Sequence, residues 1–138
     1  MLYEDATLDD IATMSSHGVT FTGNRIEVGA SSSDVTTLTD QETITSDFGT
    51  SANFAVTLAG NRTLANPFNL VAGQSGSIFV TQDGTGSRTL SFGSKFHFVG
   101  GTAPTMTTTA SAVDRVDYVV KSTDVIHAVV SLDVKATS

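Results

Sequence analysis

The chain has 138 residues, a formal net charge of −7 at pH 7 and no cysteine. This length suits one domain of ordinary size, and the absence of cysteine excludes disulfides, thiolate metal sites and cysteine nucleophiles. The acidic balance argues against a broad basic face that would bind nucleic acid, and no apolar stretch approaches the ~20 residues that cross a membrane. Charged residues are few, whereas threonine, valine and glycine are abundant, which is typical of an all-β protein.

The negative charge is concentrated at the front of the chain. Residues 1–47 hold nine of the fourteen acidic residues and one of the seven basic residues, so their net charge is −8. Residues 48–138 carry a net charge of +1. The acidic front is either a solvated leader or a segment that lies against a basic surface of a partner. Because an export signal begins with basic residues, we expect none here.

Residues 4–14 predict a short helix, in which Thr7 and Asp10 have the spacing of a capping box. A helix of this length is not stable alone in water, so it either docks on another surface or stays disordered. Its apolar face would consist of Leu8, Ile11 and Met14.

The next residues predict the boundary of an N-terminal arm. Residues 19–28 read as a hairpin around a Gly-Asn turn, and residues 29–33, GASSS, are typical of a flexible link. Residues 34–45 alternate weakly and predict one or two short strands. We therefore expect an acidic arm over residues 1–46 and a β body over residues 47–138.

The clearest pattern of the body lies between Gly73 and Phe98. An apolar run at residues 78–80 is followed by the turn Asp-Gly-Thr-Gly at residues 83–86. Residues 88–92 then alternate, and so do residues 96–98, which places large side chains on one side and small polar ones on the other. This order of strand, turn, strand, turn and strand is typical of a sheet with one buried face.

Further strands complete the predicted fold. Residues 53–58 and 62–64 alternate before the turn at Asn-Pro, and residues 99–113 form a long polar connection. A final hairpin places alternate residues of 116–120 and 126–134 on one apolar face. About eight short strands without a long amphipathic helix predict an all-β fold, namely a jelly-roll-like β-sandwich with an extended N-terminal arm.

No arrangement of residues in the sequence indicates an enzyme. The three histidines, His17, His97 and His127, have no spacing that would make them converge on a metal. No G-x-S-x-G elbow is present, and the single carboxylate of the turn at residues 83–86 is far short of a calcium loop. We therefore expect no catalytic residue, no cofactor and no metal.

The final hairpin carries apolar side chains on both sides, so one side is expected to meet another subunit or the N-terminal segment. The alternative is a hairpin that is buried on both faces within a single chain. The candidates for a subunit interface are Tyr118, Val119, Val125, His127 and Val129.

Residues 52–104 resemble a module of tailed-bacteriophage virion proteins. The resemblance is carried by GNRTL at residues 60–64 with the following Asn-Pro, GQSG at residues 73–76, RTLSFG at residues 88–93 and GTAP at residues 101–104. It extends over roughly residues 48–135 and implies a structural protein of the virion. Similar modules occur in tail-fibre and other appendage proteins and in small head decoration proteins.

The absence of heptads and shaft repeats favours a capsid decoration protein, also called a cement protein, on the surface of the capsid. Such a protein binds the major capsid protein, sits at threefold points as a homotrimer and stabilises the shell. It would bind neither nucleic acid nor a membrane. From parity and charge, the candidate capsid contacts of the arm are Leu8, Asp9, Asp10, Ile11 and Met14.

Two alternatives remain open. The first is a tail-fibre, appendage or adaptor protein that takes part in host attachment, with the arm as its connection to the tail. The second is a lectin-like carbohydrate-binding sandwich. The second is weakened by an aromatic content of 7 % without tryptophan, because sugar-binding platforms normally use such rings.

Overall fold

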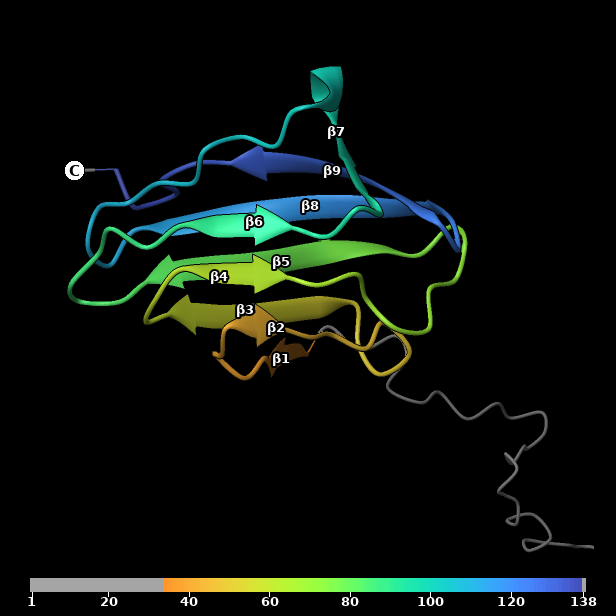
Figure 1. Ribbon diagram of the computed structural model, residues 1–138, viewed down its shortest axis with the longest axis horizontal. Coiled ribbons are helices and arrows are strands. Elements are labelled where there is room, and N and C mark those ends of the chain that lie inside the picture. Colours follow the sequence, from red (N-terminus) through yellow and green to blue (C-terminus); the bar gives the residue numbers. More distant parts are fainter. Residues whose placement is uncertain (1–33, 138) are drawn as a thin grey trace, which may run out of the picture. The chain divides into compact units, whose positions relative to one another are not determined.

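The computed structural model describes residues 34–137, which form two packed β-sheets (Figure 1). The helix expected over residues 4–14 and the hairpin expected over residues 19–28 lie outside the described residues. The same holds for the candidate capsid contacts Leu8, Asp9, Asp10, Ile11 and Met14.

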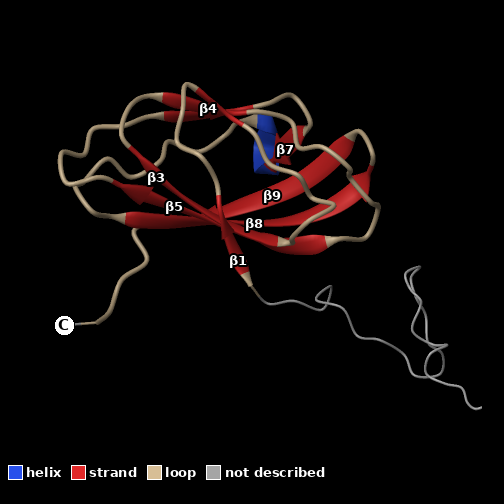
Figure 2. Ribbon diagram, turned by 90° about the horizontal axis from the view of Figure 1, so that it is seen from below, coloured by secondary structure: helices blue, strands red, loops and turns tan. Residues whose placement is uncertain are grey.

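Within residues 34–137, nine strands are arranged in a six-stranded sheet, in the order β1-β3-β5-β8-β9-β7, and a three-stranded sheet, in the order β2-β4-β6. Figure 2 shows the two sheets edge-on as separate layers, with β4 in one layer and β3, β5, β8 and β9 in the other. The all-β fold with two packed sheets is therefore confirmed. The strands are β1 (Val35–Thr37), β2 (Thr43–Ile44), β3 (Asn53–Leu58), β4 (Arg62–Leu64), β5 (Ser75–Gln82), β6 (Leu90–Phe92), β7 (Phe96–Phe98), β8 (Val113–Ser122) and β9 (Val125–Ser131).

The first six strands wind as a coil between the two sheets. Odd-numbered β1, β3 and β5 pair in parallel in the large sheet, and even-numbered β2, β4 and β6 pair in parallel in the small sheet. In Figure 1, β3 and β5 of the large sheet point to the left, whereas β4 and β6 of the small sheet point to the right. This order differs from the expected jelly-roll-like order, in which neighbouring strands are antiparallel. Alternation predicts which face of a strand is buried, but not which strand lies beside it.

The large sheet is completed by the final hairpin and by β7. Strands β8 and β9 pair antiparallel across a turn at Thr123 and Asp124, as the sequence predicts, and β7 lies parallel to β9. Strand β9 ends at Ser131, so Leu132 and Val134, which we expected on the core face, lie beyond the sheet and are about half exposed. The sequence pattern assigns residues 34–46 to the arm. In the structure they contain β1, which pairs with β3, and β2, which pairs with β4.

The core lies between the sheets and follows the predicted alternation. On β3 and β5 the inward residues are almost fully buried, and the ring of Phe48 stacks on Phe54 with a centroid distance of 5.4 Å. Phe48 also contacts Tyr118, at 4.6 Å. The largest fully buried side chains are Phe54, Ile44, Leu58, Leu64, Ile78, Ile126, Val116 and Val120.

Tyr118, proposed from the sequence as an interface residue, is a core residue. Its side chain is 3 % exposed, because alternation places it on the inner face of β8 between Val116 and Val120. The hydroxyl donates a hydrogen bond of 2.7 Å to the carbonyl oxygen of Ala52. This bond joins β8 to the segment that leads into β3, so Tyr118 stabilises the fold instead of facing a second subunit.

Burial gives Tyr118 a measurable effect at alkaline pH. Desolvation of the phenolate raises the pKa of Tyr118 from 10.0 to about 12. The folded protein therefore holds this proton more tightly than the unfolded chain, and the stability that results is lost as pH rises from about 10 through about 12. Phenylalanine has no hydroxyl that titrates, so in Tyr118→Phe this alkaline loss of roughly 2–3 kcal/mol in the free energy of unfolding should be absent. Urea unfolding across this pH range measures the difference. An equal alkaline dependence in wild type and variant would contradict this assignment.

The turn at residues 83–86 is organised by the Asp83 carboxylate. It accepts hydrogen bonds from the backbone N–H groups of Thr85 and Gly86, at 3.1 and 3.0 Å, and pairs with the Arg88 guanidinium at 2.8 Å. Gly86 adopts a φ of +75°, a conformation that favours glycine. The carboxylate thus stabilises the turn that the sequence predicts at these residues.

These contacts predict a dependence of stability on acid. Arg88 first, and then the N–H of Gly86, lower the pKa of Asp83 from 3.8 to about 2. Since a lowered folded-state pKa stabilises the protein above the unfolded pKa, this contribution is lost as pH falls from about 3.8 through about 2. In Asp83→Asn the free energy of unfolding should therefore fall less steeply with decreasing pH in this range, as followed by circular dichroism. An acid limb of unchanged steepness would show that the pair does not matter.

Candidate functional site

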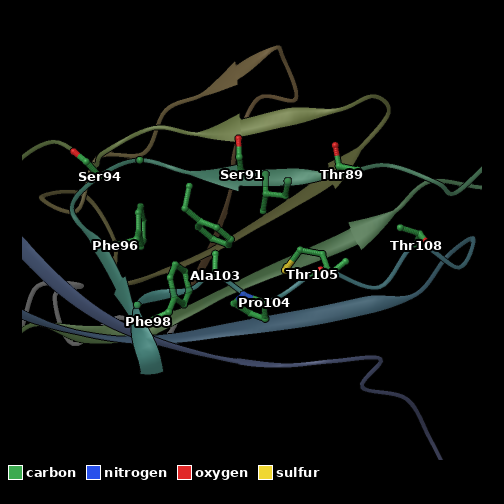
Figure 3. A pocket seen from close by; sticks show the side chains of 14 residues that line it. Thr89, Ser91, Ser94, Phe96, Phe98, Ala103, Pro104, Thr105 and Thr108 are labelled. Carbon is green, nitrogen blue, oxygen red and sulfur yellow. The ribbon is translucent and has the colours of Figure 1, made fainter.

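A groove of about 570 Å³ lies beside β6, between this edge strand and the connection that joins β7 to β8 (Figure 3). The small sheet has three strands where the large sheet has six. Next to β6 the second layer therefore continues as this irregular connection and not as a strand. The connection begins with a short 3-10 turn at Val99–Gly101.

Aromatic rings and methionine line one part of the groove. Phe92 lies with its ring edge-on to Phe96 and Phe98, at centroid distances of 5.5 and 4.8 Å. Met106, on the connection, is 5 % exposed and anchors the opposite wall to the core. The remaining lining consists mainly of glycine, alanine, proline and hydroxyl side chains, and none of the lining residues is charged. The hydroxyl side chains belong to Thr89, Ser91, Ser94, Thr105 and Thr108.

Backbone contacts hold the connection at a fixed distance from β6. The buried carboxylate of Asp114 accepts hydrogen bonds from the N–H groups of Thr107 and Asp133, both at 2.7 Å. The N–H of Ser87 donates to the carbonyl of Thr108 at 2.7 Å. The wall of the groove is therefore tied both to β8 and to the segment that enters β6.

The outer face of the large sheet holds four of the five residues expected at a subunit interface. Val119 and Val129 are 52 % and 59 % exposed. His127 is exposed as well, and its ring lies 6.4 Å from that of His97 on β7. Val125 is half-buried, at the turn end of β9. These residues share a face away from the core, whereas Tyr118 lies within it; their contact with another subunit stays a prediction.

Within residues 34–137, no group of three or more histidine, aspartate or glutamate side chains is placed to hold a metal ion. His97 and His127 make a pair without a third such ligand among these residues. No helix in this range is long and apolar enough to cross a membrane.

The groove was not anticipated from the sequence, in which residues 99–113 read as a polar connection. One signal was present. Met106 is a large apolar residue in a run of threonine and alanine, and such an isolated residue often attaches a loop to the core. The other wall of the groove includes Leu90 and Phe92 of β6, and alternation correctly predicts that both face inward.

Comparison with known families gives a match within the described residues. Residues 42–121 match the model of a family described as "putative phage tail fibre C-terminal domain". The match covers more than half of the chain and includes strands β2 to β7, most of β8 and all residues that line the groove. No curated protein and no solved structure matches the chain.

Proposed function

The chain belongs to the family of phage tail fibre C-terminal domains, and from this membership we propose that it is a non-enzymatic part of a tail fibre or related appendage that takes part in host attachment. The family match supports a structural protein of the virion. It is also the observation that carries the proposal, because the matched residues contain most of the body and the whole lining of the groove.

The match supports the tail alternative better than the capsid cement protein that the sequence pattern favoured. That interpretation rested on the absence of shaft repeats and on an acidic arm that lies largely outside the described residues. The matched family is named for tail fibres, and the match covers β2 to β7 and most of β8. We therefore propose the tail, and not the capsid surface with its major capsid protein, as the site of this chain.

The groove supports a contact function and not a reaction. Its lining contains no histidine, carboxylate, lysine or arginine, so no residue there can act as a general acid or base near neutral pH. Apolar rings and hydroxyl groups can instead contribute buried area and hydrogen bonds to a bound partner.

Cryo-electron microscopy of the particle that contains this chain tests the proposal. We expect its density on the tail. Density at the threefold positions of the head shell would overturn the tail assignment and restore the cement interpretation. As a second measurement, an excess of purified chain should slow adsorption of the phage to its host, whereas a chain without a role in attachment would leave the adsorption rate unchanged.

We further propose that the outer face of the final hairpin joins subunits, as in the expected homotrimer. Val119 and Val129 expose apolar side chains there, and a charge placed between two such faces would be desolvated without a partner. Val119→Lys should convert the assembly to monomers in sedimentation experiments. The matched control is Thr57→Lys, an exposed position on β3 of the same sheet. Equal assembly of both variants would remove this face from the interface.

A further inference from the structure

We propose that the groove beside β6 binds an extended, uncharged polypeptide segment of a partner protein, which adds to the small sheet as a fourth strand. This inference does not depend on where the chain sits in the virion. It rests on the free backbone edge of β6, on the incomplete second layer and on the chemistry of the groove.

The backbone edge of β6 is open toward the groove. On its other side, β6 pairs with β4: Arg62 N–H donates to the carbonyl of Thr89, and Gly93 N–H donates to that of Leu64, at 2.9 and 2.8 Å. Because alternate residues of a strand bond to opposite sides, the N–H and C=O groups of Leu90 and Phe92 point away from β4. No described residue outside the strand ladders bonds to them through its backbone. They offer two donors and two acceptors in the spacing of a strand.

The groove occupies the place where the next strand of the small sheet would lie. The small sheet has three strands against six in the large sheet, and β6 is the edge strand on the side of the groove. A strand added about 4.8 Å beyond β6 would enter the space between β6 and Thr105 on the connection (Figure 3). It would extend the second layer over the large sheet and complete the ladder that β4 begins.

Exposed strand edges are usually protected, and the protection of β6 lies only in its length of three residues. Proteins place charged residues, proline or a bulge on an edge strand to prevent another chain from pairing with it. β6 has the sequence Leu-Ser-Phe, without any of these features. An edge that keeps its backbone groups free beside a groove is the arrangement by which a sheet accepts an extended peptide.

The two faces of the small sheet define the side chains of the partner strand. The inward face beside β6 is apolar, with Phe92, Phe98 and Met106. The outward face carries hydroxyl groups in register, with Thr63 and Ser91 in a hydrogen bond of 2.8 Å. A fitting partner therefore alternates apolar and small hydroxyl residues. It is uncharged, because no groove residue could pair with a buried charge.

A carbohydrate fits these observations less well. A sugar presents many hydroxyl groups that need donors and acceptors once they leave water. The groove supplies no amide or carboxylate side chains for them. Its regularly spaced free groups belong to the backbone of β6, which matches the repeat of a peptide.

The test uses the full chain with methyl-labelled methionine and follows the Met106 signal by nuclear magnetic resonance. The probe is a seven-residue peptide with blocked ends, in which threonine alternates with valine and phenylalanine. We expect the peptide to shift the Met106 signal in a saturable manner. The same peptide with alternate backbone nitrogens methylated along its pairing edge should bind about tenfold more weakly or not at all.

A matched pair of variants tests the location. Thr105→Lys places a charge on the groove wall and should weaken peptide binding about tenfold. Thr109→Lys changes an exposed threonine of the same connection that does not line the groove, so binding should be unchanged. An unshifted Met106 signal, equal binding of the methylated peptide, or equal binding by both variants would each overturn the proposal. A shift caused by neutral oligosaccharides but not by the peptide would assign the groove to glycans instead.

Discussion

Replacing Gly76 with alanine is expected to destabilise the fold by about 3 kcal/mol or more. Gly76 lies on β5 directly opposite Tyr118 of β8. A Cβ atom at this position would lie 2.0 Å from the carbonyl oxygen of Ala52 and 2.9 Å from the Tyr118 hydroxyl. The backbone must therefore move, and the buried hydrogen bond from Tyr118 to Ala52 is lost with it. Urea unfolding of the purified chain measures the effect.

Gly84→Ala is the matched control. Gly84 lies in the turn after β5, and an added Cβ would meet no atom within 4 Å. Its φ is outside the left-handed region, so alanine is expected to change stability by no more than ~0.5 kcal/mol. Alanine also lowers the entropy of the unfolded chain, which favours folding, so a similar loss of stability in both variants would show that the loss at Gly76 does not come from the close approach to Ala52.

The strands were predictable because a strand with one buried face leaves a period-two signal in its own sequence. Phe54, Val56 and Leu58 alternate in the sequence and are all buried in the structure. The final hairpin follows the same rule through Ile126 and Ala128. Such local signals need no knowledge of neighbouring strands, which is why the all-β fold could be predicted.

The order of the strands could not be predicted in the same way. Strands β4 and β6 begin in similar segments, at residues 61–64 and 87–90, and lie side by side as parallel strands of one sheet. Each is followed by a strand of the other sheet, so its partner is more than 20 residues away in the sequence. Pairing at that distance depends on the packing of the layers, which leaves no fixed period in the chain.

The groove escaped prediction for a related reason. Its two walls, β6 and the connection at residues 99–112, are separate segments, and its position follows from the unequal number of strands in the two sheets. The sequence shows that Asp114 and Asp117 point to opposite faces of one strand, but it does not show which of them is buried. The structure buries Asp114, at 2 % exposed, and leaves Asp117 near the surface.

Asp114→Ala is expected to cost about 3–5 kcal/mol, because it leaves two backbone donors without acceptors. The two carboxylate oxygens accept from Thr107 and Asp133, each at 2.7 Å. Asp133 has a φ of +52°, a left-handed conformation that this hydrogen bond helps to hold. Asp114→Asn retains one acceptor and should lose about half as much. Asp124→Asn, at a side chain that is 83 % exposed, should be close to neutral and serves as the control.

Asp114→Asn can distinguish an effect on the stability of the sandwich from an effect on the shape of its groove. Thr107 follows Met106 on the groove wall, so loss of its hydrogen bond frees the wall to move away from β6. In Asp114→Asn we expect faster amide exchange at Met106 and Thr107 than in β3, because β3 is held by partners on both sides. Uniformly faster exchange throughout the sandwich would mean that Asp114 supports the fold as a whole. Faster exchange confined to the connection would make Asp114 the residue that sets the width of the groove.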